Sequence, residues 1–491
     1  MSAFLGLDVG TSGVKAVVID GVDRVLAEAS APLAVSRPRP LWSEQWPDAW
    51  WEATASALDQ LVAARPVGLS DIAAVGLSGQ MLGVALLDEA DRALRPALLW
   101  SDGRARAECA EIEAKVPGFA ERVGCRAMPG FPAPKLRWLA RHEPETLERA
   151  RRILLPKDHV RLRLTGEAAS DRADSSATLL MDTAAGAWDP ALVAVAGIRP
   201  ELLPRLVEPD EVCGEVRPEW AARWGLPLRT PVVGGAGDNL CGALGAGVRA
   251  TGDGCLGIGT SGVYGLANDR FLPALGGGMH THRHAVRGLF AQHGCVLSAG
   301  AALAWIAGVV GAADIGALLA EVEVADIPVA ATPVFTPYLA GERTPHDDPT
   351  LAAAFSGLTL ATTRLHLVQA VLEGVALAFG DCHRALAATG ASVARLSLVG
   401  GGARSRLWAR LIASAIDLPL RRPESGAVGP ALGAARLARA GIGGPLVASD
   451  GAGDEVEPSA AVADALAAKR AAYGAQAVLP HPGAGRSARY T

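Results

Sequence analysis

Two aspartates beside glycine-rich turns are the residues of this chain best suited to phosphoryl chemistry. Asp8 interrupts the apolar run Leu5–Val9, where an unpaired carboxylate would be costly. Asp238 lies in Gly-Gly-Ala-Gly-Asp-Asn, where a predicted strand gives way to a predicted helix. Phosphoryl transfer needs a cation to neutralise phosphate oxygens and a carboxylate to accept a hydroxyl proton. Asp8 suits the first role, directly or through water, and Asp238 the second. Capping of the following helix is the alternative for Asp238.

A repeated pentapeptide accompanies these aspartates. Gly-Thr-Ser-Gly-Val occurs at residues 10–14 and again at 259–263, about half of the chain apart. Apolar runs flank each copy, which predicts a strand, a tight turn and a second strand. Chance recurrence of small residues in a chain with 57 glycines is the alternative. Two such turns facing each other could bind a nucleotide tail through glycine amides and hydroxyls. The hydroxyls are those of Thr11, Ser12, Thr260 and Ser261.

Composition and missing motifs exclude several other classes of protein. The 46 basic and 51 acidic residues give a net charge of −5, which argues against a nucleic-acid partner. The sequence contains neither a P-loop motif nor a Gly-x-Gly-x-x-Gly with the acidic residue of a dinucleotide site. Seven cysteines without a C-x-x-C pair are typical of reduced thiols. Residues 297–313 are charge-free but too short for a membrane span, which favours a buried helix. With no room for a signal peptide before Asp8, we expect a cytoplasmic protein without a membrane partner.

Strands alternate with helices along the chain, which predicts α/β layers. Residues 71–88 and 395–402 show apolar strand patterns around glycine turns, whereas 50–64 and 403–417 show helical periodicity. The repeat indicates a duplicated domain with its boundary near residues 248–253. From about residue 449 the chain is alanine-rich and helical, and its last dozen residues are typical of a loose tail.

From residue 4 to about residue 440, longer segments of the chain resemble the FGGY-type carbohydrate kinases. Within that family the resemblance is strongest to the xylulokinases. These segments include GLDVGTSGVKAVVID, LLWSDGRA, LLPKDHVRLRLTGE, VVGGAGDN, YLAGERTPHDDP and LSLVGGGARSRLW. One family signature is found around Pro132, Lys135 and Trp138, and a second runs from Phe355 to Glu373. The resemblance implies an α/β fold of two duplicated actin-like (ribonuclease H-like) domains around a central cleft. We expect an N-terminal domain at 1–248 on the sugar and phosphate side, a C-terminal domain at 249–445 on the nucleotide side, and a helical extension with a loose tail at 446–491.

The same resemblance implies an ATP-dependent kinase that phosphorylates the terminal hydroxyl of a ketopentose, with D-xylulose and D-xylulose 5-phosphate as the expected substrate and product. ATP and Mg²⁺ are the implied cofactors, a small-molecule sugar is the implied partner, and a homodimer is possible. Asp8 is then expected near the magnesium, Asp238 is the base, and Asn239 holds the sugar. The implied nucleotide contacts are Thr11, Ser12, Thr260 and Ser261 at the phosphates and Gly401, Gly402 and Ala403 at the adenine, with Gly300 nearby.

One position departs from the family pattern. Xylulokinases usually have Gly-Gln-Met-His where this chain has Gly79-Gln80-Met81-Leu82. Met81 and Leu82 occupy the positions that contact the sugar in the family, and an unpaired polar group there costs ~1–3 kcal/mol. A water or another side chain could replace the imidazole and keep D-xylulose as the substrate. The alternatives are another pentulose, a deoxy-ketose or a pentitol, or a non-catalytic ATP or sugar sensor.

Three further features allow two interpretations each. His280, His282 and His284 alternate, so on a strand they would share one face like metal ligands, or form a polar face beside the cleft. Trp42 could stack on a sugar or belong to the core. Arg343 could bind phosphates or lie in a proline-braced surface loop.

Overall fold

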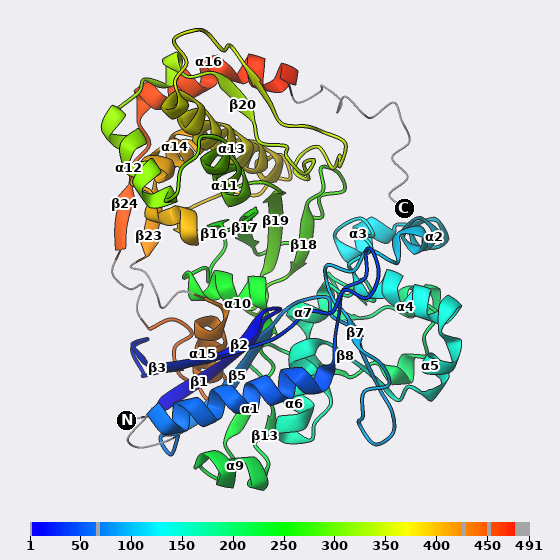
Figure 1. Ribbon diagram of the computed structural model, residues 1–491. Helices are drawn as coiled ribbons and strands as arrows, with labels where there is room; N and C mark the ends of the chain where they lie inside the picture. The colour runs from blue at the N-terminus through cyan, green and yellow to red at the C-terminus, as the bar shows by residue number, and fades with distance from the viewer. Residues whose placement is uncertain (1, 65–68, 424–428, 449–452, 477–491) are drawn as a thin grey trace.

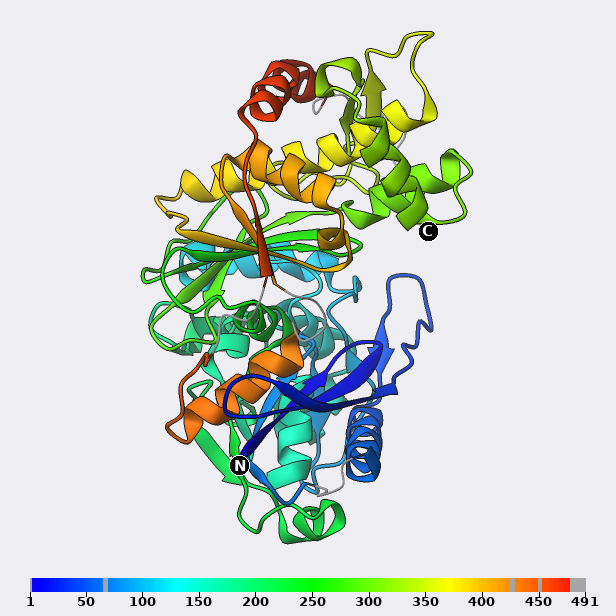
Figure 2. The same cartoon turned by 90° about the vertical axis from the view of Figure 1, so that its left-hand side faces the viewer.

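The computed structural model describes residues 2–64, 69–423, 429–448 and 453–476, which form two α/β domains, one above the other in Figure 1. Each domain is built around a seven-stranded mixed sheet. The view turned by 90° shows the two domains again stacked along the vertical axis (Figure 2). The predicted α/β class is therefore confirmed.

The first sheet has the strand order β13-β14-β5-β1-β2-β3, with β15 also paired to β5. Its β1 is antiparallel to β2 and parallel to β5. The strands are β1 (Ala3–Val9), β2 (Gly13–Ile19), β3 (Val25–Pro32), β5 (Ile72–Gly79), β13 (Val212–Glu215), β14 (Pro231–Val233) and β15 (Ala236–Gly237).

The second sheet repeats this arrangement in the order β18-β19-β17-β16-β22-β23-β24. Here β16 is antiparallel to β17 and parallel to β22, as β1 is to β2 and β5. The two copies of the pentapeptide form the β1–β2 and β16–β17 turns, so the duplication expected from the repeat is confirmed. The strands are β16 (Asp253–Ile258), β17 (Gly262–Asn268), β18 (His280–Arg283), β19 (Phe290–Val296), β22 (Arg395–Val399), β23 (Leu420–Pro423) and β24 (Gly453–Val456).

Two helices cover opposite faces of the first sheet. Helix α1 (Pro47–Ala64) packs against β2 and β3, and α15 (Pro430–Gly441) packs against β1 and β5. A Cβ atom on Gly6 or Gly76 would lie 1.9 Å from the carbonyl oxygen of Ala431 or Ala434, respectively, so only glycine permits this approach. Helix α15 lies between β23 and β24 of the second sheet in sequence, yet it packs beside the blue strands of the first domain (Figure 1). The exact domain boundaries at 248 and 445 stay a prediction.

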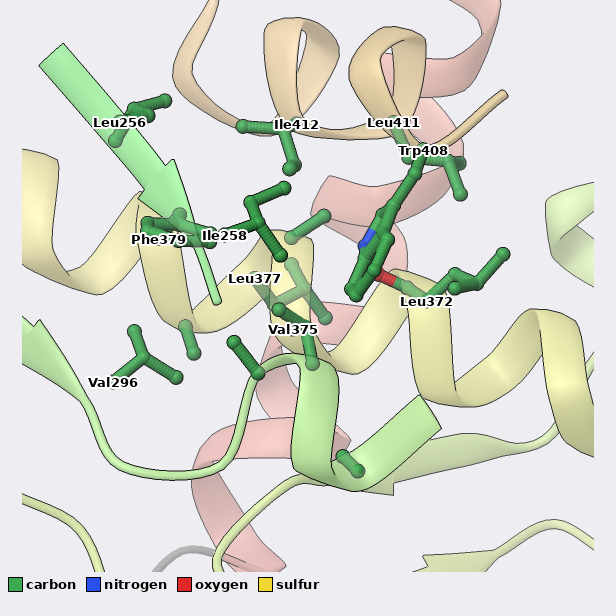
Figure 3. Packing of buried hydrophobic residues seen from close by; sticks show 14 of the residues in the cluster. Leu256, Ile258, Val296, Leu372, Val375, Leu377, Phe379, Trp408, Leu411 and Ile412 are labelled. Atoms are coloured by element: carbon green, nitrogen blue, oxygen red, sulfur yellow. The ribbon is translucent and has the colours of Figure 1, made fainter. Parts of the chain in front are cut away.

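The core of the second domain lies between its sheet and the long helix α13 (Arg364–Ala387). Trp408 of α14 (Arg406–Ile416) packs close to Leu372 and Ile258 (Figure 3), and its Nε1 donates to the Leu372 carbonyl at 3.1 Å. Within the described residues, α13 is the one helix long and apolar enough to cross a membrane, but 78% of its apolar window is buried. The buried helix predicted within 297–313 is α11 (Gly300–Val309), with Leu303 and Ile306 in the core.

Smaller elements complete both domains. The remaining helices are α2 (Arg106–Lys115), α3 (Phe119–Val123), α4 (Pro132–His142), α5 (Pro144–Arg149), α6 (Pro156–Thr165), α7 (Arg172–Ser176), α8 (Pro190–Val195), α9 (Pro218–Trp224), α10 (Asp238–Gly245), α12 (Ile315–Ala325) and α16 (Ala460–Gln476). Short strand pairs are formed by β4 (Glu44–Gln45) with β7 (Ala97–Leu98), β6 (Ala85–Leu87) with β8 (Arg152–Leu154), β9 (Ala169–Asp171) with β12 (Arg205–Val207), β10 (Met181–Asp182) with β11 (Ala187–Trp188), and β20 (Val334–Thr336) with β21 (Ala354–Ser356). The C-terminal extension packs on the second domain, where β24 joins the sheet and α16 contacts α14. The predicted loose tail at 477–491 lies outside the described residues.

Candidate active site

Strand register brings the two candidate catalytic aspartates to one edge of the first sheet. Asp8 on β1 is paired with Ser78 on β5, and Ser78 is paired with Ala236 on β15. Asp238 follows two residues later as the first residue of α10. Because β1, β5 and β15 are parallel, their carboxyl ends meet at the same edge, where α/β sheets commonly bind ligands.

The two carboxyl groups have raised pKa values. Burial, followed by the negative charge of Asp8, raises the pKa of Asp238 to about 8. Burial raises the pKa of Asp8 to about 6, although the neighbouring Ser78 hydroxyl and the Lys15 charge oppose the shift. In the described part of the chain, the buried Asp8 Oδ1 has no hydrogen-bond partner. Two repelling carboxylates with an unsatisfied oxygen fit a hard cation such as Mg²⁺, which prefers oxygen ligands.

A cleft of about 1170 Å³ opens beside Asp238. It is larger than the roughly 300–1,000 Å³ of typical small-molecule sites, so it has room for a nucleotide. Its walls come from α10, from the β16–β17 turn, from the glycine turn after β22 and from the start of α15. Its lining includes Asp238, Asn239, Gly259, Ser261, Gly400, Ala403, Arg404, Gly429 and Pro430.

Only some of the second-domain residues that we predict to contact the nucleotide line this cleft. Ser261 and Ala403 line it directly. The Gly300 amide instead donates to the Gly259 carbonyl at 2.9 Å, and a Cβ there would lie 2.4 Å from that oxygen, so Gly300 supports the turn from behind. Thr260, Gly401 and Gly402 are not among the cleft-lining residues. Thr260 and Gly401 are exposed, and Gly402 is packed close to Ile258 and Trp408.

Thr11 in the first-domain turn is held by a hydrogen-bond network. Its Oγ1 donates to Gln80 Oε1 at 3.1 Å and accepts from Trp100 Nε1 at 3.0 Å. Gln45 Nε2 donates to the Thr11 carbonyl at 2.7 Å, and Gln80 Nε2 donates to Gln45 Oε1 at 2.8 Å. Ser12 is exposed at the tip of the turn. Sequence reasoning did not single out Gln45 or Trp100, although each lies in a segment that resembles the family, RPLWSEQWPDAWWEA and LLWSDGRA respectively.

The predicted sugar-contacting residues lie at the end of β5, next to the Asp238 turn. A Cβ on Gly237 would lie 2.4 Å from Met81 Cγ, so Met81 packs directly on this turn. Asn239 Nδ2 lies 4.0 Å from Met81 Sδ. Leu82 has a left-handed backbone with φ of 68°, which is uncommon for a residue other than glycine. Met81, Leu82 and Asn239 are thus brought together, although only Asn239 lines the large cleft.

A buried cluster of charges lies behind the Asp238 turn. Lys157 Nζ is 2.9 Å from Asp158, 2.6 Å from Asp171 and 3.0 Å from Asp174, and all four side chains are fully buried. Burial raises the pKa of Asp174 to about 7, and the negative charge of Asp174 contributes to the raised pKa of Asp238. Sequence reasoning missed this cluster, because the segment that contains Lys157 carries no sign of which carboxylates fold against it.

None of the residues with two interpretations lines the cleft, although His282 lies beside His293, which does. Burial lowers the pKa of His282 to about 3, its ring packs near Phe131 and His293, and no group of three or more metal-ligating side chains occurs among the described residues. The Trp42 ring is covered by the Arg104 guanidinium at 3.5 Å. Arg343 does not line the large cleft.

In the part of the chain that the structure describes, no group of three or more metal-ligating side chains occurs. A Mg²⁺ ion at Asp8 would therefore take most of its ligands from phosphate and water.

Comparisons with known proteins place this geometry in a family. The N-terminal and C-terminal domains of the FGGY family of carbohydrate kinases match residues 3–245 and 255–441. Xylulose kinase of Escherichia coli (strain K12) is 42% identical over 89% of each chain, and that of Bacillus subtilis (strain 168) is 34% identical over 90% of this chain and 89% of its own. Crystal structures of a "xyloylose kinase" from Brucella ovis and a xylulose kinase from Rhodospirillum rubrum superpose with TM-scores of 0.92 and 0.89, at 42% and 32% identity, each covering 96% of this chain and 98% of the other. The chain therefore belongs to the FGGY family of carbohydrate kinases and is an ATP-dependent sugar kinase with the actin-like fold of that family.

Proposed function

We propose that this enzyme is a xylulose kinase, which transfers the γ-phosphoryl group of ATP to the terminal hydroxyl of D-xylulose. The observation that carries the proposal is the position of Asp238, between a nucleotide-sized cleft on one side and Met81 on the other. The names of relatives that are up to 42% identical support D-xylulose as the sugar.

Asp238 is the proposed general base. As the terminal hydroxyl oxygen attacks the γ-phosphorus, the Asp238 carboxylate accepts the hydroxyl proton, and the bond to the bridging oxygen of ADP breaks. Asn239 and Met81 orient the sugar for this attack. A positioned base typically contributes a factor of ~10²–10⁴ to the rate.

Asp8 is the proposed residue nearest to the magnesium. The unsatisfied Oδ1 of Asp8 and the repulsion between Asp8 and Asp238 both favour a cation at this edge. The ion, when bound with ATP, would neutralise phosphate oxygens as charge shifts to ADP. Asp8, at the end of β1, would hold this ion through its carboxylate, directly or through water.

The two pentapeptide turns are proposed to hold the phosphates from both domains. Thr11 and Ser12 approach from the first domain, and Thr260 and Ser261 from the second. Gly401, Gly402 and Ala403 form the proposed adenine side, with Gly300 behind the second turn. Closure of the two domains would exclude water, which would otherwise compete with the sugar for the phosphoryl group.

A coupled assay of ADP release across a panel of sugars tests the proposed substrate. The panel holds D-xylulose, D-ribulose, L-ribulose, 1-deoxy-D-xylulose, xylitol, D-arabitol and glycerol. We expect the highest kcat/KM with D-xylulose. If another sugar has the highest kcat/KM, Leu82 indicates a changed sugar specificity. If no sugar stimulates ADP release, the result favours the non-catalytic sensor.

Asp238→Asn tests the proposed base. We expect kcat to fall ~10²–10⁴-fold, because the amide cannot accept the proton, while ATP binding stays within about threefold. Asp253→Asn is the matched control, since Asp253 is a buried carboxylate that pairs with Arg395 in the second domain. Near-normal turnover by Asp238→Asn would contradict the assignment. The cytoplasmic location, the homodimer and the absence of nucleic-acid and membrane partners stay predictions.

A further inference from the structure

Lys135 is a fully buried lysine in the first domain. It lies on α4, and its side chain has 0% exposure. No ion pair of Lys135 is found within the described ranges, and burial lowers the pKa of Lys135 to about 7. Burying such a group is costly, which makes its contacts informative.

The Lys135 amino group donates to two backbone carbonyls, one of Leu82, which is proposed to contact the sugar, and one of Leu98 at the end of β7. Nζ donates to the Leu82 carbonyl at 2.9 Å and to the Leu98 carbonyl at 3.3 Å. The Leu98 carbonyl also accepts the Val84 amide at 3.0 Å, and Leu98 and Val84 form an isolated β-bridge. Lys135 therefore ties the chain just after Met81 to the strand β7.

The carbonyl that Lys135 holds belongs to a strained residue. Leu82 has a φ of 68°, a conformation that glycine adopts freely but that a leucine adopts only when its surroundings impose it. The adjacent Gly83 is also confined, because a Cβ there would lie 2.5 Å from Cγ of Pro156. The hydrogen bond from Lys135 is thus a contact that fixes the left-handed turn.

This turn determines where Met81 lies. Met81 packs on Gly237, next to Asp238, and its Sδ approaches Asn239 at 4.0 Å. A shift of the Leu82 backbone would move Met81 relative to the proposed base and the proposed sugar amide.

We propose that Lys135 is a positioning residue for the sugar, which acts by holding the Leu82 carbonyl and thereby the left-handed turn behind Met81. The proposal rests on the sugar-binding role proposed for Met81 and Leu82. It assigns Lys135 to sugar affinity and not to nucleotide affinity, because its contacts lie at the end of β5 and away from the residues that line the large cleft.

Steady-state kinetics of Lys135→Met, with D-xylulose and ATP varied separately, test the proposal. Methionine keeps most of the side-chain length but cannot donate to either carbonyl. We expect the KM for D-xylulose to rise at least tenfold and the KM for ATP to change less than twofold. An unchanged KM for D-xylulose, or an equal rise of both KM values, would overturn the proposal.

Lys469→Met is the matched control. Lys469 is also a largely buried lysine, but its Nζ binds the Thr332 carbonyl and Glu373 in the second domain. We expect Lys469→Met to leave both KM values within twofold. A rise in the KM for D-xylulose in this control as well would identify the effect as general destabilisation and overturn the assignment.

A double-mutant cycle with Leu82→Gly isolates the backbone role. Glycine takes the left-handed conformation without strain, so Lys135→Met should raise the KM for D-xylulose less than threefold in the Leu82→Gly background. A tenfold rise in both backgrounds would overturn the backbone role. If Lys135→Met does not fold, Lys135→Arg replaces it in the test. We expect Lys135→Arg to raise the KM for D-xylulose at least threefold and to leave the KM for ATP unchanged. An unchanged KM for D-xylulose would refute the proposal. Wild-type enzyme that fails to phosphorylate D-xylulose refutes the proposed function instead.

Discussion

Gly6→Ala tests whether helix α15 is an integral part of the first domain. A Cβ on Gly6 would lie 1.9 Å from the Ala431 carbonyl oxygen and 2.7 Å from the Ala435 amide nitrogen. An ordinary contact begins at about 3.4 Å, so α15 would have to move by about 1.5 Å from β1. Both obstacles are helix backbone, which cannot rotate away as a side chain can.

The expected cost follows from this displacement. One added carbon in a packed interior costs ~1–3 kcal/mol, and a clash with backbone belongs at or above the upper end of that range. For a domain of this size, each kcal/mol lowers Tm by ~2–4 °C, so Gly6→Ala should lower Tm by about 6–12 °C. Gly429 and Pro430, at the start of α15, line the nucleotide cleft, so the KM for ATP should also rise.

Thermal unfolding followed by circular dichroism, together with ATP kinetics, measures both effects. Gly21→Ala is the matched control, because a Cβ on Gly21 meets no atom within 4 Å. We expect the Tm of this control to be unchanged or slightly raised. Equal Tm values for the two variants would refute the argument that Gly6 is required by the close approach of α15.

Two further predictions concern a buried histidine and the first phosphate turn. Burial lowers the pKa of His159 to about 4, so between about pH 6.5 and pH 4 the unfolded chain binds a proton there that the folded protein does not. The free energy of unfolding therefore falls by about 1.4 kcal/mol for each pH unit as the pH drops through this window. Between pH 7 and pH 5, urea unfolding should show that the wild type loses about 2 kcal/mol more of this free energy than His159→Gln does. Equal losses would contradict the buried neutral state. Trp100→Phe removes the hydrogen bond to Thr11 Oγ1, worth ~0.5–1.5 kcal/mol, so the KM for ATP should rise about two- to tenfold in initial-rate assays. An unchanged KM for ATP would show that Thr11 does not depend on Trp100.

Local patterns were sufficient to predict the paired strands of both domains. The apolar runs around each Gly-Thr-Ser-Gly-Val copy form the hairpins β1–β2 and β16–β17, because strand and turn preferences act over a few residues. Asp8 and Asp238 could be singled out because a carboxylate in an apolar strand and one at a glycine turn are each unusual. Their proximity required the register between β1, β5 and β15, which the sequence does not reveal.

Contacts between distant segments were beyond sequence reasoning. The sequence of helix α15 shows only that it is amphipathic and rich in small residues. It does not show that its partners are β1 and β5, roughly 350 or more residues earlier in the chain. Lys135 belongs to a segment noted for its family resemblance, yet its role depends on the carbonyl of Leu82. The partners of Lys157 likewise depend on how α6 and α7 pack.

The position of α15 also constrains how the protein is made. The first sheet is covered on one face by a helix that ends at Gly441, so a nascent chain that has completed only the first domain still lacks part of that core. Phe4 and Ala74 stay exposed or loosely covered until α15, which follows most of the second domain in sequence, has been synthesised. Because domains usually fold one after another during synthesis, this order is unusual, and it predicts that a fragment ending near residue 248 expresses as an aggregation-prone species. Supplying residues 429–448 on the same polypeptide, through a short linker, should restore the missing face and render the fragment soluble.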